Sequence, residues 1–174
     1  MARSCGALVV SPDLQAYRRF AALPSWLKKG GCLMPVADAK LELIRRVPLF
    51  QGCGGKDLVE LGRLADEVDV PANTVLIRQG TTADAFYIVV EGRLRVERDG
   101  RVVSQLGPGE FVGEIALVDG GPRTATVTTE APSRLLVVGH REFHSLLDRF
   151  PSIERQVLLA LAQRVRAAQP EAVH

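Results

Sequence analysis

The chain has 174 residues, of which 47% are hydrophobic and 24% are charged, as in a globular domain rather than a disordered, collagen-like or disulfide-rich chain. Its net charge of +2 is too close to neutral to support broad nucleic-acid binding. No apolar run approaches the roughly 18 residues that span a bilayer, and those near the N-terminus are too short for a secretory signal, so we expect one cytoplasmic domain without a membrane segment.

Residues 1–35 differ from the rest of the chain in charge. They carry five basic residues against Asp13 alone, a net of +4, which leaves −2 for the remainder. A cap, a first-turn proline and an apolar face predict one helix here, formed by Ser11, Pro12, Leu14, Tyr17, Phe20 and Ala21. The alternative is that Met34 or Val36 is the true start and that this basic stretch is a poorly ordered extension.

Helical periodicity becomes regular from Val36 onward. Two amphipathic segments are separated by a break at Pro48. Their apolar faces are formed by Leu41, Ile44 and Val47 in the first and by Leu58, Leu61, Leu64 and Ala65 in the second. The sequence therefore predicts a helical pair before the strands.

The hydrophobic period changes between Val68 and Gly139. Short runs rich in Val, Ile, Thr and aromatic residues are separated by Gly, Pro, Asn or Asp every ~8 to 12 residues, which is typical of an all-β sandwich or barrel. The predicted strands are Glu67–Val70, Val75–Arg78, Ala85–Val90, Arg93–Arg98, Arg101–Leu106, Thr124–Thr129 and Arg134–Val138.

One hairpin in this section can be predicted in detail. Leu94 and Val96 alternate with charged residues, so one face of their strand is buried and the other is solvated. The dipeptide Asp99-Gly100 follows, and it supplies the positive φ angles of a two-residue hairpin turn.

Helical periodicity returns after Gly139 and is broken at Pro151. The two apolar stripes consist of Phe143, Leu146, Leu147 and Phe150, and of Ile153, Val157, Leu158, Leu161 and Val165. The basic residues of these helices predict a solvated face; they are Arg149, Arg155, Arg164 and Arg166. The second stripe could also pair with another copy of the chain, and residues 169–174 are expected to fray.

The β section is interrupted once, by a segment suited to anion binding. Residues 113–117 favour about one helical turn, with Gly113 at its start and Gly-Gly-Pro after it. The first turn of a helix has free backbone N–H groups, and Arg123 can return across the short loop to the same anion. The carboxylate of Glu114 would repel a phosphate, but it can accept a hydrogen bond from a sugar hydroxyl. The segment therefore predicts a ligand with a phosphate and a free ribose 2′-OH.

Residues 113–125 resemble the phosphate-binding cassette of cyclic nucleotide-binding domains, roughly F-G-E-[IL]-A-L, a short spacer and P-R-[TSA]-A. Residues 80–94 resemble the family's other signature, a Gly, an Asp, an aromatic-Tyr-Ile run and Gly-x-Leu. The likeness covers about residues 38–168. It implies a mainly β fold, an eight-stranded jelly roll with an N-terminal helical pair and two C-terminal helices.

The resemblance also implies roles for individual residues. Glu114 would accept a hydrogen bond from the ribose 2′-OH and Arg123 would bind the phosphate, while the main chain or wall contacts would come from Gly113, Ile115, Ala116 and Ala125. Thr124 occupies the family's small polar or Ala position beside the phosphate and base. Thr there favours guanine in some members, yet many bacterial cAMP binders carry Ser or Thr, so Thr124 alone does not choose the base.

Two departures from the family bear on function. Val112 stands where Phe or Gly is frequent, and a strand residue should be tolerated there. The helix-turn-helix that follows the long helix in catabolite-activator-type regulators has no counterpart before His174, so we expect no specific DNA binding.

The expected units are a basic extension (1–35), a binding domain (36–168) and a tail (169–174). The binding domain would signal to a protein effector that the sequence does not identify.

Other kinds of site are not predicted. Cys5, Cys32 and Cys53 form no C-x-x-C pair, and His140 and His144 lack a third ligand nearby, so we expect neither a disulfide framework nor a metal. No catalytic triad or carboxylate pair is visible, and the strands lack the His of an enzymatic jelly roll. We expect a non-enzymatic module that binds cAMP in preference to cGMP. The alternative is a jelly-roll interaction protein that has lost its ligand, in which Glu114 and Arg123 form a structural ion pair.

Overall fold

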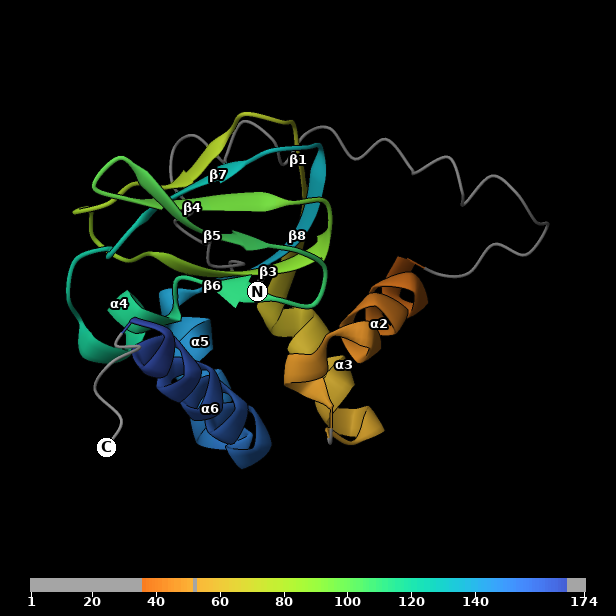
Figure 1. The fold of residues 1–174 in the computed structure, drawn as a ribbon. Helices are drawn as coiled ribbons and strands as arrows, with labels where there is room; N and C mark the ends of the chain where they lie inside the picture. The colour runs from red at the N-terminus through yellow and green to blue at the C-terminus, as the bar shows by residue number, and fades with distance from the viewer. Residues whose placement is uncertain (1–35, 52, 169–174) are drawn as a thin grey trace, which may run out of the picture.

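A computed structural model describes residues 36–51 and 53–168 of the chain. The elements are α2 (Val36–Arg46), the 3-10 turn η3 (Pro48–Phe50), α3 (Gly55–Leu64), β1 (Ala65–Val70), β2 (Val75–Ile77), β3 (Ala85–Glu91), β4 (Leu94–Arg98), β5 (Arg101–Leu106), β6 (Phe111–Val112), α4 (Glu114–Asp119), β7 (Thr126–Thr129), β8 (Ser133–Gly139), α5 (His140–Arg149) and α6 (Pro151–Ala168). The strands lie together on one side of the molecule, and α2, α3, α5 and α6 lie below them (Figure 1).

The strands form two antiparallel sheets, with strand orders β1-β8-β3-β6 and β2-β7-β4-β5. The prediction of a mainly β domain with helices before and after the strands is confirmed. Most predicted strand bounds differ from the observed ones by one or two residues, because strand ends carry little periodic signal. Ala65, predicted on a helix face, begins β1, and the predicted strands did not include β6, which is too short to show alternation.

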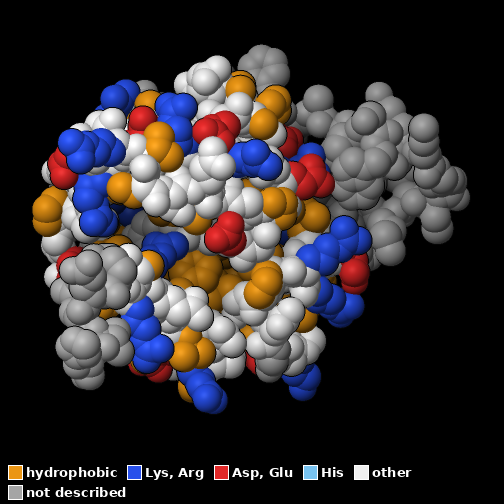
Figure 2. Space-filling view, in the orientation of Figure 1, with side chains coloured by type: hydrophobic (Ala, Val, Ile, Leu, Met, Phe, Trp, Pro, Cys, Tyr) orange, Lys and Arg blue, Asp and Glu red, His pale blue; other side chains and the backbone are white. Residues whose placement is uncertain are grey.

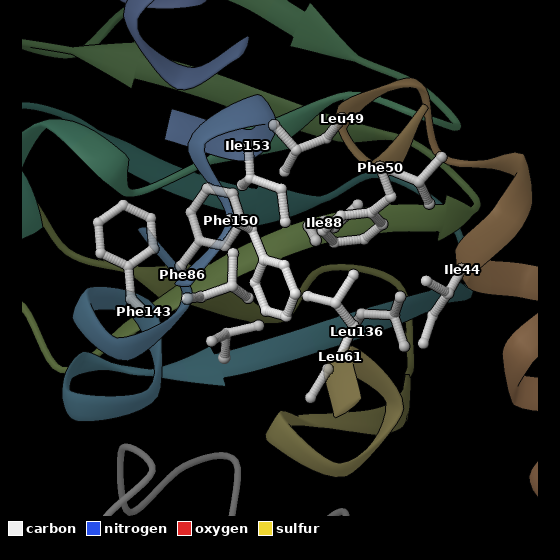
Figure 3. Packing of buried hydrophobic residues seen from close by; sticks show 14 of the residues in the cluster. Ile44, Leu49, Phe50, Leu61, Phe86, Ile88, Leu136, Phe143, Phe150 and Ile153 are labelled. Carbon is white, nitrogen blue, oxygen red and sulfur yellow. The ribbon is translucent and has the colours of Figure 1, made fainter. Parts of the chain in front are cut away.

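Strands β3 and β8 are buried on both faces and separate two hydrophobic clusters. Tyr87 and Val137 belong to the cluster between the sheets, whereas Phe86 and Leu136 belong to the cluster between these strands and the helices. This arrangement explains why both strands have nearly continuous apolar sequences rather than an alternating pattern. Figure 3 shows the second cluster, where Phe86 of β3 lies among Phe143 of α5 and side chains from the neighbouring helices.

The hairpin between β4 and β5 has the predicted turn. Asp99 and Gly100 have φ angles of 52° and 75°, and Arg98 pairs with Arg101 across the turn. Leu94 and Val96 are buried, as the alternation predicts.

The helices are only partly buried along their predicted apolar stripes. In α6, Ile153 and Val157 are buried, whereas Leu158 and Val165 are 56% and 60% exposed, so only part of the predicted stripe packs against the domain. Nothing in the described part of the chain is a helix with the length and hydropathy to cross a bilayer. The helix predicted around Ser11 and the tail 169–174 lie outside the described residues.

Candidate functional site

The short helix α4 begins where the sequence predicts it, directly after Gly113. Gly113 has a φ of 97°, which side-chain-bearing residues rarely adopt. A Cβ atom at this position would lie 2.7 Å from Nη1 of Arg123 and 3.1 Å from the carbonyl oxygen of Ala85. Glycine is therefore required both by the backbone angle and by the close approach of the Arg123 side chain.

Arg123 is 4% exposed and is held by three groups. Its Nη1 donates to the carbonyl oxygen of Gly113 at 2.9 Å, and its Nη2 donates to the carbonyl oxygen of Ala85 at 2.6 Å and to Oδ1 of Asp84 at 3.0 Å. Since a guanidinium has five N–H donors, two have no partner among the described residues and remain for a ligand. The orientation of the Arg123 guanidinium is thus fixed, although not all of its hydrogen-bond donors are used within the described residues.

The backbone of Arg123 is fixed as well. Its amide donates to the carbonyl oxygen of Thr81, and the amide of Gly80 donates to the carbonyl oxygen of Arg123, each at 2.8 Å. The two segments with sequence signatures, around Gly80 and Arg123, therefore lie side by side.

Glu114 is fully buried, and its carboxylate is only half satisfied. Oε1 accepts a hydrogen bond from Nη1 of Arg164, while Oε2 has no partner among the described residues. Burial raises the pKa of the Glu114 carboxyl above its ordinary value of 4.5, and the Arg164 guanidinium opposes that rise. A buried carboxylate oxygen without a partner is costly, so it favours a hydroxyl donor supplied from outside.

Arg164 was predicted on a solvated face of α6, and this prediction is wrong. Besides pairing with Glu114, it donates from Nη2 to the carbonyl oxygen of Phe111 at 2.6 Å, and its guanidinium carbon lies 5.6 Å from the centre of the Phe111 ring. One signal in the sequence could have indicated this: Arg164 lies seven residues after Val157 and three after Leu161, on the buried side of α6.

A cavity of about 450 Å³ opens between the sheets, α4 and α6. Such a volume is in the range of small-molecule sites, about 300–1,000 Å³. Six of the seven predicted site residues line it, namely Gly113, Ile115, Ala116, Arg123, Thr124 and Ala125. Glu114 does not line the cavity itself, but its partner Arg164 does. Further wall residues come from β2, β4, β5, β6, β7 and α6.

The other polar groups considered from the sequence form no comparable site. The rings of His140 and His144 lie 4.7 Å apart, edge to face, and no group of three metal-binding side chains is present in the described ranges. Cys53 lies 3.6 Å from the Ser152 hydroxyl, whereas Cys5 and Cys32 fall outside the described residues. The ion pair of Glu114 is with Arg164, not with Arg123 as the structural alternative supposed.

Comparison with known proteins places the chain among related sequences. A family model described as cyclic nucleotide-binding domain matches residues 67–150. A cyclic nucleotide-gated potassium channel of Rhizobium etli is 36% identical over 123 residues, which are 71% of this chain and 34% of the channel. A CRP-like cAMP-activated global transcriptional regulator of Mycobacterium tuberculosis is 30% identical over 130 residues, 72% of this chain and 58% of the regulator.

A solved structure is similar as well. The regulatory domain of Toxoplasma gondii PKA, crystallised with cAMP, is 34% identical, with a TM-score of 0.57 over 63% of this chain and 44% of that one. The chain thus spans about a third to three-fifths of the curated relatives named above.

Proposed function

Because the chain belongs to the cyclic nucleotide-binding domain family, we propose that it is a stand-alone, non-catalytic regulatory module that binds cAMP, with cGMP as a weaker ligand. We propose residues 36–168 as the binding unit, with a basic extension before it and a tail after it. In this proposal the two sheets form the family's eight-stranded jelly roll, and the module works in the cytoplasm on a protein effector, without specific DNA binding.

The cyclic phosphate is assigned to Arg123. The two N–H groups that Gly113, Ala85 and Asp84 leave unused can make charge-assisted hydrogen bonds to a phosphate oxygen. Gly113, Ile115, Ala116, Thr124 and Ala125 line the same cavity as Arg123 and would supply its main-chain and wall contacts.

The ribose is assigned to Glu114. Its unpartnered Oε2 would accept a hydrogen bond from the 2′-OH, which would satisfy the one orphaned carboxylate oxygen of the site. This buried, half-satisfied carboxylate, close to an arginine with two free donors, is the single observation that best supports the proposal. In a jelly roll that had lost its ligand, nothing would offset the cost of this buried carboxylate oxygen.

The signal is assigned to α6. Arg164 of α6 forms an ion pair with Glu114. A ligand that binds the Glu114 carboxylate would therefore also affect the contact that holds α6 against the domain. A ligand can shift α6 between a docked and a loose state only through its different affinity for the two. The exposed Leu158 and Val165 leave α6 a surface that could pair with a second copy, which we retain as a proposal.

Isothermal titration with cAMP, cGMP and 5′-AMP tests the proposed function. We expect both cyclic nucleotides to bind and cAMP to bind more tightly. The open-chain 5′-AMP has the same base and ribose, but its terminal phosphate does not have the cyclic geometry, so it should bind more weakly. Absence of heat and of chemical-shift changes with either cyclic nucleotide would favour the interaction-protein alternative.

A further inference from the structure

Arg98 lies at the end of β4 on the face that points toward the cavity. The strand alternates, with Leu94 and Val96 buried between the sheets, and Arg98 is the next residue on that face. The pairing of Glu97 with Thr126 places Arg98 across from Ala125, next to Thr124. Arg98 accordingly lines the cavity together with these two residues.

Arg98 differs from the other two arginines of the cavity in its partners. Arg123 is bound to two carbonyls and Asp84, and Arg164 to Glu114 and Phe111. The side chain of Arg98 has no hydrogen bond or ion pair within the described ranges, and it is exposed. Figure 2 shows Lys and Arg side chains gathered on the left of the view, where Figure 1 places the turn between β4 and β5. This guanidinium is free to meet a ligand.

The proposed function assigns the phosphate to Arg123 and the ribose to Glu114, and the present inference rests on it. The cavity wall near Arg98 is then left for the base of the nucleotide. Val103 is the extra residue of a β-bulge, because Val96 pairs with Ser104 while the adjacent Glu97 pairs with Val102. Val103 and Ser104 therefore both line the cavity, as does Ala167 of α6. The apolar side chains of Val103 and Ala167, together with the hydroxyl of Ser104, suit a flat purine base.

The chemistry of Arg98 selects one purine edge. A guanidinium only donates hydrogen bonds, and its fork matches the paired acceptors O6 and N7 of guanine. Adenine presents N7 beside an amino group that also donates, so it offers Arg98 one acceptor only. We propose that Arg98 is a base-recognition residue that donates to O6 and N7 of a 6-oxopurine, and so lets the cavity accept cGMP alongside cAMP.

The test compares three ligands on the intact chain. Affinities for cAMP, cGMP and cIMP are measured by titration for wild type, Arg98→Met, Arg98→Lys and the control Arg93→Met. Arg93 precedes the same strand on its other face, is exposed and does not line the cavity, so its variant removes the same charge elsewhere. The ligand cIMP carries O6 and N7 but lacks the 2-amino group of guanine.

We expect Arg98→Met to weaken cGMP and cIMP by at least about fivefold and cAMP by less than about twofold, as loss of a bidentate base contact should. Arg98→Lys should weaken the binding of cGMP and cIMP less than Arg98→Met does, but without restoring wild-type affinity. Arg93→Met should leave the affinities for all three ligands unchanged. An equal loss for all three ligands would mean that Arg98 acts on the phosphate and would overturn the proposal. A loss for cGMP without one for cIMP would assign recognition to the 2-amino group, again against Arg98. If the wild-type chain binds no cyclic nucleotide, the proposed function fails as well.

Discussion

Arg164 of α6 donates a hydrogen bond to the buried carboxylate of Glu114, a residue 50 positions earlier in the chain. The same guanidinium holds the Phe111 carbonyl, two residues before Gly113. The C-terminal helix therefore contacts both ends of the short stretch that leads from β6 into α4. Any ligand that uses Glu114 must share this carboxylate with the helix.

Replacing Arg123 should remove most of the phosphate affinity. Arg123→Ala is expected to weaken cAMP binding at least tenfold, because loss of one partner from a buried charged contact costs about 2–5 kcal/mol. It should also lower the melting temperature, since three hydrogen bonds to Gly113, Ala85 and Asp84 are lost. Arg123→Lys keeps the charge without the fork, and titration of both variants at a temperature where each is folded checks the assignment. Wild-type affinity in a folded Arg123→Ala protein would contradict it.

Glu114 should account for discrimination of the 2′-OH. Wild type is expected to bind cAMP more tightly than 2′-deoxy-cAMP by about tenfold or more, because a hydrogen bond to a charged group contributes about 1.5 kcal/mol or more. Glu114→Gln keeps the shape but removes the charge, so the difference between the two ligands should shrink. Parallel calorimetric titrations of the two nucleotides measure it, and an unchanged ratio would place the ribose elsewhere.

The affinity for cAMP should fall as the pH is lowered through the pKa of Glu114. Burial raises this pKa above 4.5, so the carboxylate takes up a proton at a higher pH than an exposed glutamate. A ligand that binds the ionised form stabilises it, and affinity is therefore full above the pKa and declines below it. Titrations from neutral to mildly acidic pH should show this decline in wild type and a flatter profile in Glu114→Gln.

Arg164→Met offers an independent check on the same pKa. Removing the guanidinium removes the opposing interaction, so the pKa of Glu114 should rise further and the decline should begin at a higher pH. A profile identical to that of wild type would show that Arg164 does not influence the carboxylate in solution.

Ligand binding should protect α6 from hydrogen exchange. We expect new protection in residues 153–168 when cAMP is added, and less of it in Arg164→Met, because that variant loses the ion pair between α6 and Glu114. Truncation after Phe150 should weaken binding less than Arg123→Ala does, since the phosphate contacts stay. If α6 exchanges identically with and without saturating cAMP, the signal must leave the domain by another surface.

The local geometry around Arg123 could be predicted because its residues are close in sequence. Gly113 and Arg123 are ten residues apart, and the glycine, the helical turn and the arginine together specify their own geometry. The Asp99-Gly100 turn was predictable for the same reason, since turn chemistry is local. The roles assigned to these residues toward a nucleotide stay predictions until binding is measured.

The remaining parts of the site depend on how distant elements pack. The contact between Arg164 and Glu114 exists only because α6 docks beside β6, which no local pattern encodes. The bulge that brings Val103 into the cavity depends on the pairing of β5 with β4, and alternation alone would place it on the other face. Leu158 and Val165 are exposed, and helical periodicity could not predict this, since it marks apolar residues without showing whether a neighbour covers them.

Strands β3 and β8 are a common wall of the two hydrophobic clusters, and this has a mechanical consequence. A protein core transmits small displacements because it is close-packed, so a shift of the helices against Phe86 also moves the backbone of β3. The first residue of that strand, Ala85, supplies a carbonyl that orients Arg123. A binding partner that presses on the helical side would therefore shift the carbonyl that orients Arg123, and with it the proposed phosphate contact, without approaching the cavity.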